Sequence, residues 1–114
     1  MNWDHIHNER RDGFEIDVFV APEDIDPADL FDEGHEETIE AIREGRLEWF
    51  TVKVTAGRLG LIMGADYLGG CCYASAREFL ACDYYDDMVA EAIQAARESI
   101  VKIKETTDDM EETQ

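Results

Sequence analysis

The sequence predicts an α+β fold, with a small antiparallel sheet of about three strands, two short helices inserted after the first strand and two C-terminal helices. Two kinds of periodicity predict it. Apolar and polar residues alternate over residues 14–20 and again over residues 49–55, as in strands with one buried face. Beyond residue 83 the apolar residues recur every three or four positions over four turns, which indicates a long helix.

The first half of the chain predicts one strand and then two short helices. The strand covers the alternating segment, residues 14–20. Asp26 followed by Pro27 has the form of a helix N-cap with proline at the first helical position, so a short helix is expected over residues 27–32. A second helix is expected over residues 35–44, because two isoleucines share one side of it and a glycine follows it.

A hairpin is expected after these helices. Its first strand covers residues 49–55, and its second begins with LGLIM, residues 59–63. The turn between them is predicted at Ala56-Gly57-Arg58. The next segment, ADYLGGCCY (residues 65–73), contains two adjacent glycines, which fit a bulge, a tight turn or a close backbone contact equally well. The segment is interpreted as a loop, with a strand as the alternative.

Two helices are expected to close the chain. Ser75 with Glu78, and Asp83 with Asp86, each place a capping side chain three residues before an acidic one. The first pair stands at the head of the short segment AREFLA. The second pair stands at the head of the long final helix.

The chain is expected to form a single domain over residues 1–104, followed by an acidic tail over residues 105–114 that frays. No linker rich in Pro, Gly or Ser divides it. It also contains no apolar stretch long enough for a secretory signal or a membrane span. The sequence therefore predicts a cytoplasmic protein.

The net charge of −18 is the extreme feature of this 114-residue chain, which has 28 Asp and Glu against 10 Lys and Arg. Nucleic acid and anionic membranes would both repel such a surface, whereas a basic protein groove would attract it. We therefore expect a basic protein surface as the partner, with no direct contact to nucleic acid or membrane. The charge does not indicate an oligomeric state.

The residues that could bind a metal or act in catalysis form no recognisable motif. Cys71 and Cys72 are adjacent, no C-x-x-C is present with Cys82, and the histidines stand at no spacing typical of zinc sites. The cysteines are interpreted as unpaired, buried thiols. The closely spaced acids from Asp24 onward lack the glycine of an EF-hand loop. We expect no cofactor, no metal site and no catalytic residue, so the protein is not expected to be an enzyme.

The carboxylates are the candidate functional residues. Residues 22–38, PEDIDPADLFDEGHEET, hold eight acids and no Lys or Arg. Glu36, Glu40 and Glu44 follow at intervals of four, where helix stability alone would favour a basic residue. Rows of carboxylates about one helical turn apart resemble the phosphates of a nucleic-acid strand. The predicted partner-binding residues are Asp24, Asp26, Asp29, Asp32, Glu33, Glu36, Glu37, Glu40, Glu44, Asp87 and Glu91.

Two motifs, DYLGGCCY at residues 66–73 and YYDDM at residues 84–88, resemble small acidic proteins encoded by phages, plasmids and other mobile elements. The resemblance carries over no catalytic residue. It implies a role similar to that of anti-CRISPR or other anti-defence proteins, some of which act as DNA mimics. The expected function is then inhibition of a nucleic-acid-binding complex, such as a CRISPR effector, through its basic surface.

Two alternatives stay open from the sequence. In the first, the acidity only keeps the protein soluble. In the second, the protein is a small structural or regulatory interaction module with incidental acidity, and its functional face is apolar and lies around Trp49, Tyr67 and Tyr73.

Overall fold

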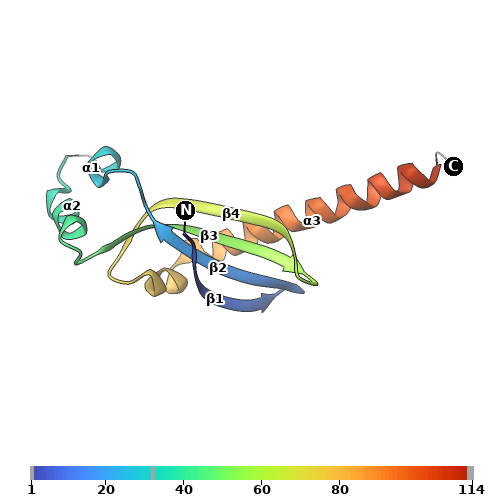
Figure 1. The fold of residues 1–114 in the computed structure, drawn as a ribbon, viewed down its shortest axis with the longest axis horizontal. Coiled ribbons are helices and arrows are strands. Elements are labelled where there is room, and N and C mark those ends of the chain that lie inside the picture. The colour runs from blue at the N-terminus through green and yellow to red at the C-terminus, as the bar shows by residue number, and fades with distance from the viewer. Residues whose placement is uncertain (1, 32, 113–114) are drawn as a thin grey trace.

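The computed structural model describes residues 2–31 and 33–112 and confirms an α+β fold. Four antiparallel strands form one sheet in the order β1-β2-β3-β4, and a long C-terminal helix packs on one face of it (Figure 1). The strands are β1 (Asp4–Arg11), β2 (Phe14–Pro22), β3 (Glu48–Arg58) and β4 (Leu61–Tyr73). The helices are α1 (Pro27–Leu30), α2 (Glu36–Arg43), the 3₁₀ helix η1 (Ala76–Ala81) and α3 (Asp83–Glu112).

The core lies between the sheet and α3. The alternation predicted from the sequence places Ile16 and Val18 of β2 and Val52 and Val54 of β3 on the same face, where all four are fully buried. The first half of α3 covers them with a stripe of apolar residues at helical spacing. This stripe consists of Tyr85, Met88, Val89, Ala92, Ile93 and Ala96.

The prediction of three strands is wrong by one, because β1 was not expected. Its sequence, DHIHNERR, has a single apolar residue, so it shows no apolar alternation. Ile6 packs against the core, and the other inward side chains are polar and bond to each other and to α3. Glu9 lies at the centre of this network, 2.7 Å from Arg11, 2.8 Å from His7 and 2.9 Å from the hydroxyl of Tyr85. Burial acts to raise the pKa of Glu9, but these hydrogen bonds outweigh it and lower the pKa.

The predicted position of the hairpin turn is also wrong. β3 continues through Gly57 and Arg58, and the two-residue turn is Leu59-Gly60. Both turn residues have positive φ, 54° and 77°, which is the conformation of a type I′ turn. Leucine is an unusual residue for this conformation, so the sequence pattern did not reveal it.

The segment left open between loop and strand is part of β4. It pairs with β3 as far as Tyr73, across a bulge in which Gly69 and Gly70 stand opposite Thr51. Gly70 has a φ of 67°, which explains why a glycine is needed there.

Of the two C-terminal helices predicted, the first is a short 3₁₀ helix and the second is one long α-helix. Ser75 caps η1, because its hydroxyl accepts a hydrogen bond from the backbone N–H of Arg77 at 3.2 Å. The segment predicted as a tail is continuous with α3 as far as Glu112, and this end of the helix projects beyond the sheet (Figure 1).

Replacing Ile93 by Ala is expected to lower the free energy of unfolding by about 2–4 kcal/mol, because this side chain is 4% exposed and packs between α3 and the sheet. Deleting residues 106–114 is expected to change it by less than about 0.5 kcal/mol, since the described side chains from residue 101 onward are exposed. Chemical denaturation of both variants tests this. A deletion as destabilising as Ile93→Ala would contradict the assignment of the core.

Candidate partner-binding surface

The segment between β2 and β3, residues 23–47, is called the acidic insert below. It contains α1 and α2 and lies beyond one end of the sheet (Figure 1). Trp49 of β3 attaches the insert to the sheet. Its indole N–H donates a hydrogen bond to the carbonyl oxygen of Ile25 at 2.8 Å, and its ring centroid lies 5.7 Å from that of Phe31. The insert is therefore held at a defined position.

Glu23 provides a second attachment. Its carboxylate accepts hydrogen bonds from the hydroxyl of Thr51, from the backbone N–H of Gly70 at 3.1 Å and from that of Ile25 at 3.3 Å. The bond from Thr51 is the main cause of the lowered pKa of Glu23. The charge of Glu23 is thus engaged by hydrogen bonds within the protein. One of the donors, the N–H of Gly70, belongs to the β4 bulge.

Every predicted partner-binding residue that the structure describes is exposed. Asp32 lies outside the described residues. Three members of the set have local partners, so part of their charge is already used for stability. These pairs are Asp26 with Arg43 at 3.2 Å, Glu36 with the backbone N–H of Gly34 at 3.3 Å and Glu44 with Arg46 at 2.8 Å.

The other acids of the insert are not neutralised. In the described part of the chain, no hydrogen bond or ion pair engages the side chains of Asp24, Asp29, Glu33, Glu37 and Glu40. The insert contains two arginines and no lysine, and both arginines, Arg43 and Arg46, already pair with acids. A surplus of exposed negative charge is therefore concentrated at this end of the molecule.

Asp87 and Glu91 belong to a different element. Both are exposed on α3, which packs on β3 and β4, whereas α1 and α2 lie beyond the end of the sheet (Figure 1). The predicted set is therefore divided between the acidic insert and α3 and does not form one continuous row.

The three aromatic residues of the alternative site do not come together. Trp49 is the attachment of the insert, and Tyr73 packs against Phe50 and Phe79 on the core side of the sheet. Tyr67 lies on the opposite face and is 61% exposed. On that face Lys53 lies 4.6 Å from the ring centroid of Trp3, an arrangement that the sequence did not predict.

The cysteines are free thiols, and Cys71 is buried. Burial raises the pKa of the Cys71 thiol to about 11, so it is protonated at neutral pH and is a poor nucleophile or metal ligand in that form. Within residues 2–31 and 33–112, no three His, Cys, Asp or Glu side chains are grouped so that they could hold a metal ion.

Comparisons with protein-family models, curated proteins and solved structures find no match to this chain. None of the described helices combines the length and the apolar character needed to cross a membrane.

Proposed function

We propose that this protein is an acidic inhibitor or binding protein that occupies a basic, nucleic-acid-binding surface of a partner protein. One observation carries the proposal. The acidic insert exposes five carboxylates without a described partner and is fixed to the sheet through Trp49 and Glu23. A positioned negative surface favours association with a partner of opposite charge.

The arrangement of charges on α2 supports nucleic-acid mimicry. Glu36 and Glu40 are exposed on the same helix one turn apart, a rise of about 6 Å, with Glu37 beside them. Carboxylates at this spacing can replace phosphates as the counterions of Lys and Arg in a groove. The resemblance of DYLGGCCY and YYDDM to proteins of mobile elements favours an anti-CRISPR or other anti-defence role for such an inhibitor.

Affinity capture from a bacterial lysate tests this function. At low salt we expect the immobilised protein to retain a basic nucleic-acid-binding protein, and moderate salt should release it because screening weakens interactions between exposed charges. Excess duplex or single-stranded DNA should compete for the same groove. An interaction indifferent to both salt and DNA would argue against the proposal.

A second candidate is an interaction module that uses an apolar face. The exposed apolar side chains of β4, Leu61, Ile62 and Tyr67, favour it. Binding through this edge strand would persist at moderate salt and in the presence of DNA, so the same experiment separates the two functions.

A further inference from the structure

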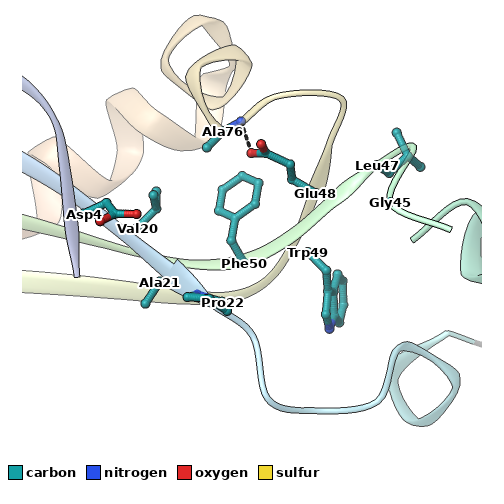
Figure 2. Close-up of a pocket in the computed structure, with 10 residues that line it drawn as sticks. All are labelled: Asp4, Val20, Ala21, Pro22, Gly45, Leu47, Glu48, Trp49, Phe50 and Ala76. Atoms are coloured by element: carbon teal, nitrogen blue, oxygen red, sulfur yellow. Dashed lines mark hydrogen bonds between the residues drawn. The ribbon is translucent and has the colours of Figure 1, made fainter. Parts of the chain in front are cut away.

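A pocket of about 380 Å³ lies at the base of the acidic insert, between the insert, the end of the sheet and η1 (Figure 2). Its floor is apolar and is formed by the buried side chains of Val20 and Phe50. Leu47 and Trp49 line its edge, but the ring of Trp49 lies on the other side of β3, away from Phe50 and Glu48 (Figure 2). Its volume is at the lower end of the range for ligand pockets and suits a single side chain better than an extended segment.

Two carboxylates stand at this pocket, those of Asp4 and Glu48, and Figure 2 shows the ring of Phe50 between them. One oxygen of Glu48 accepts a hydrogen bond from the backbone N–H of Ala76 at 2.7 Å, which fixes the direction of the side chain. No Lys or Arg lines the pocket, and neither carboxylate forms an ion pair in the described part of the chain.

We infer that this pocket receives an arginine side chain of the basic partner. The apolar floor matches the aliphatic part of arginine, and the two unpaired carboxylates match its positive head. Guanidinium suits this setting better than the ammonium of lysine, because it is planar and less strongly hydrated, stacks on aromatic rings and presents several donors in a fork. The pocket continues the acidic insert, whose final residues line it, so both surfaces face the same partner.

This inference rests on the proposed function, and it can be tested without the partner. The probe is Nα-acetyl-arginine amide, titrated into the isotope-labelled protein and followed by NMR. We expect saturable shifts of the backbone amide signals of Glu48, Phe50 and Ala76, which line the pocket, with a millimolar dissociation constant. The neutral isostere Nα-acetyl-citrulline amide should bind at least about tenfold more weakly, because it lacks the charge that the two carboxylates recognise.

The matched variants carry Asp4→Asn with Glu48→Gln, or Asp12→Asn with Glu15→Gln, two exposed acids that lie outside the acidic insert. The first pair should weaken arginine binding by about tenfold or more, and the second pair, which lies outside the pocket, should leave it unchanged. Glutamine at position 48 keeps an acceptor for the N–H of Ala76, so thermal unfolding should be preserved. Equal binding of the citrulline or lysine amide, or equal effects of the two pairs, would overturn the inference.

The failure of this proposal is distinct from that of the proposed function. If arginine amide did not bind but the partner was still captured in a salt-sensitive way, only the proposal that the pocket receives an arginine would be overturned. Normal arginine binding without such capture would overturn the proposed function alone.

Discussion

Replacing Glu33, Glu37 and Glu40 together by Lys is expected to abolish capture of the basic partner and to leave the fold intact. The three side chains are exposed and make no described hydrogen bond or ion pair, so the folded state loses neither kind of contact. Binding should weaken by about 100-fold or more, since reversal places like charges together across the interface. Retention of the partner at low salt measures this effect, and circular dichroism verifies the fold.

The control variant reverses Glu15, Glu98 and Glu105, which are exposed and lie outside the acidic insert. Each replacement changes the charge by two units, so the two triple variants have the same net charge. The control should retain the partner at low salt. If both variants lost the partner equally, net charge alone would govern binding. If neither did, the acids of the insert would serve solubility only.

Glu36 and Glu44 are left out of this variant because the structure gives them other roles. Glu36 accepts a hydrogen bond from the backbone near the start of α2, and Glu44 pairs with Arg46. Reversing either would disturb the insert as well as its charge, and a loss of binding could then come from either change. The sequence did not separate these acids from the unpaired ones, because the pairs depend on how the loops fold.

The strands that the sequence predicted are those whose inward side chains are apolar. In β2 and β3, buried valine and isoleucine side chains alternate with more exposed residues, so the period of two can be recognised in the sequence itself. In β1 the inward positions include Glu9 and Arg11, whose partners include Tyr85 and Asp86 of α3, more than seventy residues away. A strand stabilised by distant polar partners has no local signature.

The sequence predicted the acidic surface better than the pocket at its base. Exposure of the insert follows from its composition, because ten acids in residues 23–47 cannot be buried without partners. The pocket combines residues of β1, β2 and β3 with the end of the insert. Asp4 and Glu48 are 44 positions apart, and only the formation of the sheet brings both to one pocket.

Replacing Gly64 by Ala is expected to lower the free energy of unfolding by about 3 kcal/mol, at the upper end of overpacking effects. A Cβ at this position of β4 would lie 2.3 Å from the carbonyl oxygen of Ala92 and 2.4 Å from the backbone nitrogen of Ala96. Both atoms belong to the backbone of α3, so the clash can be relieved only if the whole helix moves away from the sheet. That movement would open the core around Val89 and Ile93.

Gly69→Ala is the matched control, because it makes the same change in the same strand. There the new Cβ would come closest to a carboxylate oxygen of Glu23, at 3.0 Å, and no backbone atom lies within van der Waals contact. A loss of less than about 1 kcal/mol is expected. Denaturant unfolding of both variants provides the comparison. Because the contacts at Gly64 are with backbone atoms, adding Ala96→Gly should not restore stability to Gly64→Ala. Restoration, or equal stability of the two single variants, would show that α3 does not approach β4 as closely as described.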